Sequence, residues 1–553
     1  MTEYTPPPVG HRYANKDDYL TARAALIAAE QAHSFRATLS PSTPLEARAN
    51  AILHALKQQD EAELHTMHPN GTGFELGHKF LHGLSTIASS KIFAIAAQAP
   101  KGALLHCHFD AILPPELLLA DARRNPHMCI RTDAPLTHAG FFAAALPTFS
   151  VLPAAELSAA SANGVDVFSP TYVAGSWMPY ARFLERFPGG AAEAERWLRA
   201  KVVLHAERAY APEQTVDGIW ALFKRSFAVL RGLVGYVTAW KAHFARVLWH
   251  LARDGVSYAE IRIPMQWQFF VKTDDASREL SRKEMVGLLK EVLDEEVPKI
   301  RAEGLVFWGA RFIYGSFRLC ERENMRWMME DCIELKQEYP DLICGFDMQG
   351  QEDDGHSHLH WIQELLDFRA RCDSLGLDIP FIFHAGETLQ PSTSQNLYDA
   401  ILLSTKRIGH GFALPQQHPY LLQLCRDRKI AIETCPISNE VLGLAPTGIR
   451  NHPLPILLAT CVPCTINTDD PGCWEASMSH EWYQVMVGTG GGDGEAGGMD
   501  LKGWRKLAGW SLEYSCMPDA ERKEAERVFE RQWEEFCGWI VETYGAEIES
   551  GKN

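Results

Sequence analysis

Histidines and acids stand at several points of this 553-residue chain where a short apolar run ends. His106 and His108 are two residues apart, so that in an extended strand both imidazoles point to the same face and can bind one metal ion. A later run ends at His384, with Glu387 three residues further on, and another run ends at His410. Imidazole nitrogens are common zinc ligands, and a nearby carboxyl group can act as an acid or a base.

Paired carboxylates, Asp469 and Asp470, follow the last apolar run, inside the segment NTDDP at 467–471. Three imidazoles and one carboxylate form a ligand set that suits Zn²⁺ and leaves an open position for water. Such an ion lowers the pKa of its bound water from ~15.7 toward ~7, so that hydroxide is available at neutral pH. Each motif alone is weak, but together, each at an expected strand end, they predict a metal site with an open position for water.

Short apolar runs alternating with segments of helical periodicity are the elements that must position these residues. Strands that alternate with helices favour a parallel sheet, and eight such units favour a closed (β/α)8 barrel, or TIM barrel. The carboxyl ends of its strands converge on one face, where chemistry takes place. The eight runs are 103–108, 256–263, 306–313, 342–347, 380–384, 407–410, 430–434 and 464–469.

The chain divides into three parts in this α/β interpretation. Residues 1–97 are expected to form a helical N-terminal extension, since Thr43 and Glu46 make a capping box at the start of an apolar stripe. Residues 98–545 are expected to form the barrel, and 546–553 a tail. The gap between the first two strands is far longer than the others, which predicts an insertion over about 112–215.

The composition fits a globular protein and argues against polyanionic partners. The hydrophobic fraction is 46% and the charged fraction 22%, close to ordinary globular values. The net charge of −17 predicts that neither nucleic acid nor an anionic membrane is a partner. We see no signal peptide and no membrane span, and the 13 cysteines are odd in number and scattered, so we expect a cytoplasmic protein.

Three other motifs are expected to be structural. Cys461 and Cys464 form a C-x-x-C without a second pair, so we interpret them as strand residues. His356, His358 and His360 cannot share one face of a helix, and we expect loop or solvated histidines. The glycine-rich segment 488–498 contains two acids and does not follow a strand, which favours a surface loop over a phosphate cradle.

The motifs resemble those of the adenosine/AMP deaminase family of the amidohydrolase superfamily. They are HCHFD at 106–110, HAGE at 384–387, GHG at 409–411 and NTDDP at 467–471. Other segments are similar to the adenosine deaminase-related growth factor branch, also called the adenosine deaminase 2 type. These are PKGALLH at 100–106, WALF at 220–223, GFD at 345–347, TCPISN at 434–439 and LEYS at 512–515.

The resemblance covers about residues 98–540 and implies the TIM barrel and one Zn²⁺ per chain. Members of the branch carry an N-terminal helical extension used in dimerisation and an insertion after the first strand, so a homodimer is expected. Secreted members have a signal peptide and a disulfide in the insertion. This chain shows no signal peptide, and the sequence of its insertion differs from theirs. We therefore do not expect the receptor-binding roles of that segment in this chain.

The resemblance also implies the roles of the site residues. His106, His108, His384 and Asp469 would ligate Zn²⁺, and Asp469 would also accept the water proton. Glu387 would protonate N1 of a purine, which requires a raised pKa. His410 would orient the water and stabilise the developing oxyanion.

Substrate contacts follow in the same way. Asp470 would share a hydrogen bond with N7, and the backbone N–H of Gly350 would reach N3. Asp110 would accept the ribose 5′-hydroxyl, and a phosphate there would be repelled, so we expect a purine nucleoside rather than AMP. Trp177 and Phe183 are our hypothesis for a lid over the substrate.

The function expected is deamination of adenosine, and of 2′-deoxyadenosine, to inosine and ammonia. One alternative keeps the chemistry but changes the substrate to adenine, an N6-substituted adenosine or AMP. A second alternative is amide or ester hydrolysis, which has no particular need for Glu387 together with Asp470. A third is a non-catalytic, growth-factor-like binding protein, in which the motifs would have decayed. The other zinc deaminase signature, with H-x-E and P-C-x-x-C, is not matched.

Overall fold

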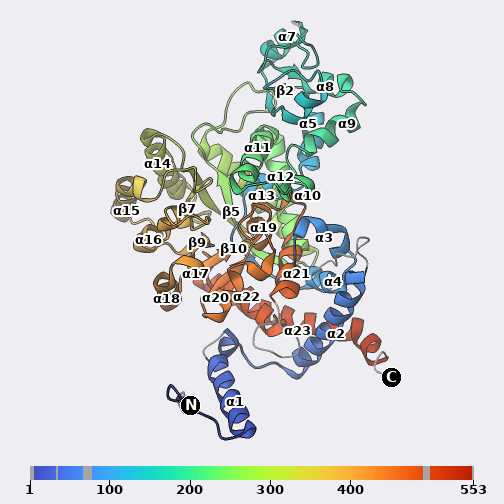
Figure 1. Cartoon of the computed structure of the whole chain (residues 1–553). Coiled ribbons are helices and arrows are strands. Elements are labelled where there is room, and N and C mark those ends of the chain that lie inside the picture. The colour runs from blue at the N-terminus through green and yellow to red at the C-terminus, as the bar shows by residue number, and fades with distance from the viewer. Residues whose placement is uncertain are drawn as a thin grey trace.

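The computed structural model describes residues 5, 7–32, 35–66, 77–162, 164–489 and 499–550. Within these residues, eight parallel strands close into a barrel, which confirms the predicted (β/α)8 fold (Figure 1). The strands are β1 (Gly102–Leu104), β5 (Val256–Pro264), β6 (Ala310–Phe317), β7 (Ile343–Gln349), β8 (Ile382–Ala385), β9 (Arg407–His410), β10 (Ala431–Thr434) and β11 (Cys464–Ile466).

The barrel consists of two four-stranded sheets, ordered β1-β5-β6-β7 and β8-β9-β10-β11. A bridge between Phe346 and Phe381 joins β7 to the segment that leads into β8. A second bridge, between Cys107 and Asp469, joins the segments that follow β1 and β11 and so closes the barrel. Strand β6 begins later than the predicted run 306–313. Gly309 has a φ of 103°, a left-handed conformation that interrupts an extended strand.

Helices follow most strands and cover the outside of the barrel (Figure 1). Their apolar sides are buried against the strands. Helix α13, which follows β5, begins with a capping box between Ser281 and Glu284. The outer helices are α12 (Val237–Arg253), α13 (Arg282–Ala302), α14 (Arg322–Glu338), α15 (Ile362–Leu375), α16 (Asn396–Leu402), α18 (Pro419–Arg428), α20 (Leu454–Ala459) and α22 (Leu501–Glu513).

The long connection between β1 and β5 forms a small antiparallel sheet of its own, ordered β3-β2-β4. It stands at one end of the molecule in Figure 1, and helix α11 (Val216–Val234) runs from it back to the barrel. Its main elements are α5 (Pro115–Arg124), β2 (Met128–Thr132), β3 (Pro147–Val151), β4 (Met178–Pro179), α8 (Tyr180–Arg186) and α9 (Ala191–Arg199).

The N-terminal helices lie near the other end of the molecule (Figure 1). Helix α2 (Pro44–Thr66) packs along α23 (Asp519–Ser550), where Trp533 Nε1 donates to Glu46 Oε1 over 2.9 Å. They are accompanied by α1 (Lys16–Ala32), α3 (Phe80–Ile87) and α4 (Lys91–Gln98). Among the described helices none is by itself long and apolar enough to cross a membrane; α3 and α4, bent by 89°, meet those criteria as a pair.

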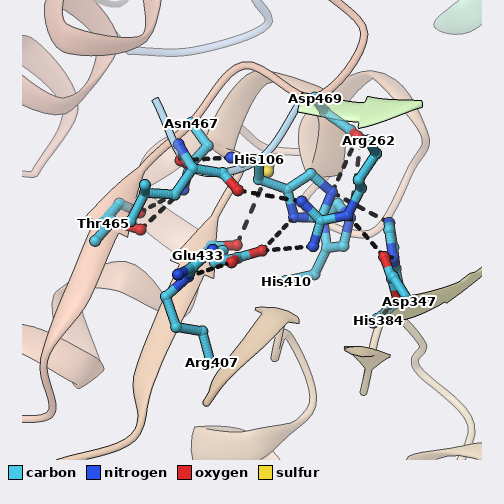
Figure 2. Close-up of polar contacts among 12 residues, drawn as sticks. His106, Arg262, Asp347, His384, Arg407, His410, Glu433, Thr465, Asn467 and Asp469 are labelled. Carbon is cyan, nitrogen blue, oxygen red and sulfur yellow. Dashed lines mark hydrogen bonds and ion pairs between the residues drawn. The ribbon is translucent and has the colours of Figure 1, made fainter. Parts of the chain in front are cut away.

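Charged side chains fill part of the barrel interior and form a continuous network (Figure 2). Arg262 donates to Asp347 over 2.7 Å and to Glu433 over 2.8 Å. Arg407 donates to Glu433 and to Glu260, each over 2.6 Å. All five side chains are buried, and burial alone would raise the pKa of Glu433, but Arg262 and Arg407 hold it well below its usual range.

We expect Arg407→Met to lower the free energy of unfolding by about 3–5 kcal/mol, because it leaves Glu260 and Glu433 as buried carboxylates without this partner. Urea unfolding followed by circular dichroism measures the change. Lys290→Met, which breaks an exposed ion pair with Asp294, is the matched control and should leave the midpoint almost unchanged. Equal midpoints for both variants would contradict a structural role for the network.

Candidate metal centre and active site

The four residues predicted to bind metal meet at the carboxyl ends of β1, β8 and β11. Ligand atoms of His106, His108, His384 and Asp469 all lie within 4.8 Å of one another, and all four residues are buried. His106 Nε2 is 3.1 Å from His384 Nε2, and Asp469 Oδ1 is 3.0 Å from His108 Nε2. Three imidazoles and one carboxylate are therefore close enough together to bind a single metal ion.

Carboxylates of the barrel network fix which nitrogen of two imidazoles carries the proton (Figure 2). His106 Nδ1 lies 2.8 Å from Glu433 Oε2, and His384 Nδ1 lies 2.6 Å from Asp347 Oδ2. A carboxylate only accepts, so each Nδ1 is the donor and each Nε2 carries a lone pair. Burial lowers the pKa of His384 to about 3, against the opposing charge of Asp347, and keeps it neutral.

The two Nε2 lone pairs thus face each other at 3.1 Å beside a carboxylate oxygen. Such an arrangement is repulsive by itself and is stabilised by a cation that accepts all these lone pairs. Imidazoles whose second nitrogen donates to a carboxylate are typical of protein metal sites. The residues present therefore fit a metal ion.

Backbone conformation turns two of the site residues inward. Asp469 has a φ of 56° and His410 a φ of 59°, left-handed values that are uncommon for residues other than glycine. Such strain concentrates at functional sites, where the surrounding structure enforces it. Ser438 Oγ donates to Asp469 Oδ2 over 2.7 Å, which leaves Oδ1 directed toward the imidazoles.

A cavity of about 230 Å³ opens over this cluster. Its lining includes eight residues that the sequence singles out: His108, Asp110, Gly350, His384, Glu387, His410, Asp469 and Asp470. At Gly350, whose φ is 105°, an added Cβ would come within 3.0 Å of the Phe317 ring, so that a side chain there would be strained.

Helix α11 forms one wall of the cavity, a role that the sequence analysis missed. The residues concerned share one face of the helix, because they are spaced by three, one, three and four positions. They are Trp220, Phe223, Lys224, Phe227 and Arg231. The signal was present as an aromatic stripe at helical spacing, but such a stripe equally predicts ordinary core packing.

The structure does not bring the hypothesised lid residues, Trp177 and Phe183, to the cavity. Phe183 is fully buried between Phe168 and Phe187 in the connection between β1 and β5. Trp177 lies under the guanidinium of Arg131, 4.5 Å from ring centre to Cζ. Both aromatic rings therefore stabilise that connection, and the lid hypothesis is corrected in favour of α11.

Three neighbouring carboxyl groups in the cavity differ in their affinity for a proton. Burial, followed by the charges of Asp469 and Glu352, raises the pKa of Glu387 well above its usual range. Burial, followed by the charges of Asp469 and Asp110, does the same to the pKa of Asp470. Burial alone would raise the pKa of Asp469 too, but its contacts with the imidazoles of His106 and His108 hold this pKa well below its usual range.

Of these three carboxyl groups, Asp469 is therefore the anion, and Glu387 and Asp470 are neutral. Neutral carboxyl groups can donate a hydrogen bond or a proton, whereas a carboxylate only accepts. Groups whose environments push their pKa values apart are typical of paired acid and base roles.

A chain of hydrogen bonds sets the protonation of His410. The backbone N–H of Leu454 donates to His452 Nδ1 over 3.0 Å, so the proton of this neutral imidazole lies on Nε2. His452 Nε2 then donates to Asn439 Oδ1 over 3.0 Å, and Asn439 Nδ2 donates to His410 Nδ1 over 3.1 Å. Burial keeps His410 neutral by lowering its pKa, so its proton lies on Nε2. His410 thus presents an N–H donor 3.8 Å from Asp469 Oδ2.

Two of the motifs expected to be structural, the cysteine pair and the histidine triplet, lie in the described part of the chain. Cys464 lies in β11 as predicted, whereas Cys461 comes before the strand, with a left-handed φ of 57°. His358 is in a loop but is buried rather than solvated, and its backbone N–H donates to Asn396 Oδ1. Most of the glycine-rich segment, 490–498, lies outside the described residues.

Comparison with known proteins decides the family. The adenosine deaminase family model matches residues 203–530, and the adenosine/AMP deaminase N-terminal model matches residues 7–96. This chain belongs to the adenosine deaminase family. An adenosine deaminase of Phlebotomus duboscqi is 33% identical, covering 84% of this chain and 82% of the relative. Adenosine deaminase 2 of Sus scrofa is 31% identical, covering 90% of this chain and 89% of the relative.

Solved structures of other deaminases share the fold of this adenosine deaminase family member. The Arabidopsis N6-mAMP deaminase has a TM-score of 0.52 at 16% identity, covering 79% of this chain and 99% of its own. The adenine deaminase of Arthrobacter aurescens has a TM-score of 0.51 at 17% identity, covering 78% and 99%. At such identities the likeness shows the TIM-barrel fold alone.

We expect Asn439→Asp to lower the kcat of the deaminase about 10–100-fold while KM and bound metal stay unchanged. The isosteric carboxylate can only accept a hydrogen bond, so it favours the tautomer of His410 whose proton lies on Nδ1 and leaves Nε2 without one. Steady-state kinetics and atomic emission measure both effects. Asn451→Leu, an exposed asparagine outside the chain of hydrogen bonds, is the control. Full activity of Asn439→Asp, or loss of its metal, would contradict the tautomer assignment.

Proposed function

We propose that this chain hydrolyses the amino group of adenosine, and of 2′-deoxyadenosine, to give inosine and ammonia. The observation that carries the proposal is the pair of neutral carboxyl groups, Glu387 and Asp470, that line the cavity together with the metal-binding cluster. Purine ring nitrogens are acceptors, so a site that recognises N1 and N7 needs two such donors. Relatives of this chain over most of its length are named adenosine deaminase.

The metal that we propose is one Zn²⁺ per chain, held by His106, His108, His384 and Asp469. Nitrogen-rich ligand sets with one carboxylate suit zinc, and a structural neighbour from the same superfamily, at 16% identity, has bound Zn. When bound, the ion supplies hydroxide at neutral pH by lowering the pKa of its water.

The side chains of the cavity have distinct tasks in this reaction. Addition of water at C6 breaks the aromatic system of the purine, and Glu387 delivers the proton that N1 must gain. Asp469, the anion of the site, accepts the proton of the water, and His410 Nε2–H stabilises the negative charge that develops on oxygen. Asp470 donates to N7, and the Gly350 backbone N–H meets N3. Collapse of the adduct releases ammonia.

The proposed substrate is a nucleoside, because Asp110 lies at the cavity wall and would repel a 5′-phosphate. Structural neighbours have been solved with IMP and with GMP, so nucleotide binding occurs on this fold. A non-catalytic binding protein is disfavoured, since every predicted metal-binding and proton-transfer residue is present and lies at one site.

We propose in addition that the N-terminal extension, residues 1–97, forms a homodimer contact. Helix α1 exposes Tyr19, Leu20, Leu26 and Ile27, apolar side chains that association would bury. Light scattering of the full chain measures the mass, and a monomer would contradict the contact. The division of the chain into an extension, a barrel with an insertion over 112–215, and a tail stays a prediction. The cytoplasmic location also stays a prediction, and cell fractionation tests it.

Ammonia release from adenosine, 2′-deoxyadenosine, AMP and adenine tests the proposed function. We expect rapid turnover of the two nucleosides, little turnover of AMP, and loss of activity with a chelator that returns when Zn²⁺ is added. Adenosine left unchanged in the presence of zinc would refute the proposal. Fast turnover of AMP would instead refute the role of Asp110.

We expect Glu387→Gln to lower kcat by about 10²–10⁴-fold with zinc still bound, because the amide cannot deliver a proton. The wild-type pH profile provides a second measurement. Burial and neighbouring acids raise the pKa of Glu387, so the acid is protonated below that pKa, and kcat should fall as pH rises through it. Loss of zinc from Glu387→Gln, or an alkaline limb that persists unchanged in the variant, would contradict the assignment.

A further inference from the structure

Asp110 and Arg231 face each other at the wall of the cavity formed by α11. Asp110 lies in the short turn after β1 and is 3% exposed, whereas Arg231 comes from the last turns of α11. Arg231 Nε is 3.7 Å from Asp110 Oδ2. In the described part of the chain, both atoms are buried and neither has a hydrogen-bond partner.

A distance of 3.7 Å is too long for a hydrogen bond, so the two groups face each other without bonding directly. Native proteins seldom leave a buried donor and a buried acceptor unsatisfied. A ligand atom that satisfies both must accept from the Nε–H of Arg231 and donate to the carboxylate of Asp110. A hydroxyl group does both with one oxygen, and two normal hydrogen bonds fit across this gap.

A phosphate group does not meet the same requirement. At neutral pH its oxygens mainly accept, so it would satisfy Arg231 but leave Asp110 without a donor and in contact with a second negative charge. Lys224, another cation of the cavity wall, pairs with Asp354 over 2.7 Å. Arg318 donates through one nitrogen, Nη2, to the backbone oxygens of Met348 and His384.

We infer that Arg231 is a specificity-determining residue that, together with Asp110, holds a hydroxyl group of the substrate sugar. The inference rests on the proposed function, because the base must occupy the end of the cavity that holds Glu387 and Asp470. The sugar then extends toward Asp110, and its 5′-hydroxyl lies between the carboxylate and the guanidinium. The substrate class is a nucleoside with a free 5′-hydroxyl.

Kinetics with adenosine and with 5′-deoxyadenosine, which lacks this hydroxyl, test the inference. We expect Arg231→Met to lower kcat/KM for adenosine about 10–100-fold, the value of one hydrogen bond from a charged donor. The same substitution should leave kcat/KM for 5′-deoxyadenosine within about threefold, because that substrate has no hydroxyl to lose. Arg231→Lys, which keeps a cationic donor, should recover part of the adenosine activity.

Arg225→Met is the matched control. Arg225 lies on the same helix but donates to the backbone oxygen of Ala144 and does not line the cavity. It should leave both kcat/KM values and their ratio unchanged. Equal losses for the two substrates in Arg231→Met would overturn the inference, since they would mean a structural role for the arginine. AMP turned over by the wild type as fast as adenosine, and lost in Arg231→Met, would also overturn it, since Arg231 would then bind phosphate.

Calorimetric binding of inosine and 5′-deoxyinosine separates this inference from the proposed function. If the wild-type protein leaves adenosine unchanged, the proposed function is contradicted, but the binding of the two inosines can still be measured. Preference for inosine in the wild type that disappears in Arg231→Met supports the hydroxyl contact. The same preference in both proteins overturns it.

Discussion

Arg262 and Arg407 carry full positive charges in a barrel interior from which water is excluded, and such charges are stable there only beside carboxylates. Glu433 meets both arginines and also accepts the Nδ1 proton of His106; Asp347 meets Arg262 and accepts the Nδ1 proton of His384. The same ion network therefore fills the barrel and directs two imidazole lone pairs to one point. Stability of the core and the chemistry of the metal site depend on a single set of contacts.

Burial gives the acids above that point different roles. Asp469 lies against the imidazoles of His106 and His108 and stays an anion, while Asp470, its neighbour in sequence, has no comparable contacts and takes up a proton. Glu387 is neutral for the same reason as Asp470. Because like charges in a desolvated cavity repel strongly, ionisation of Asp469 itself favours protonation of the other two acids. The acid and base roles thus follow from packing as much as from residue type.

Helix α11 completes the site from outside the barrel. Its aromatic side chains close the cavity, and Arg231 adds a cation next to Asp110. The helix comes from the long connection between β1 and β5 and begins just after the predicted insertion 112–215, so the end of this connection forms part of the cavity wall. In the reaction that we propose, the strand ends hold the reacting groups, and Arg231 of α11 contacts the sugar.

Much of the barrel and its site was predictable from sequence, because the β/α alternation brings residues at strand ends to one face whatever their spacing along the chain. His106, His384 and Asp469 could be grouped on that basis before any coordinates. The ion partners inside the barrel could not, since the register between strands decides which charges meet. Nor could sequence choose between Trp177 and α11 as the cover of the cavity. An aromatic stripe at helical spacing predicts a buried face, and only the tertiary packing decides whether that face meets the core or the substrate.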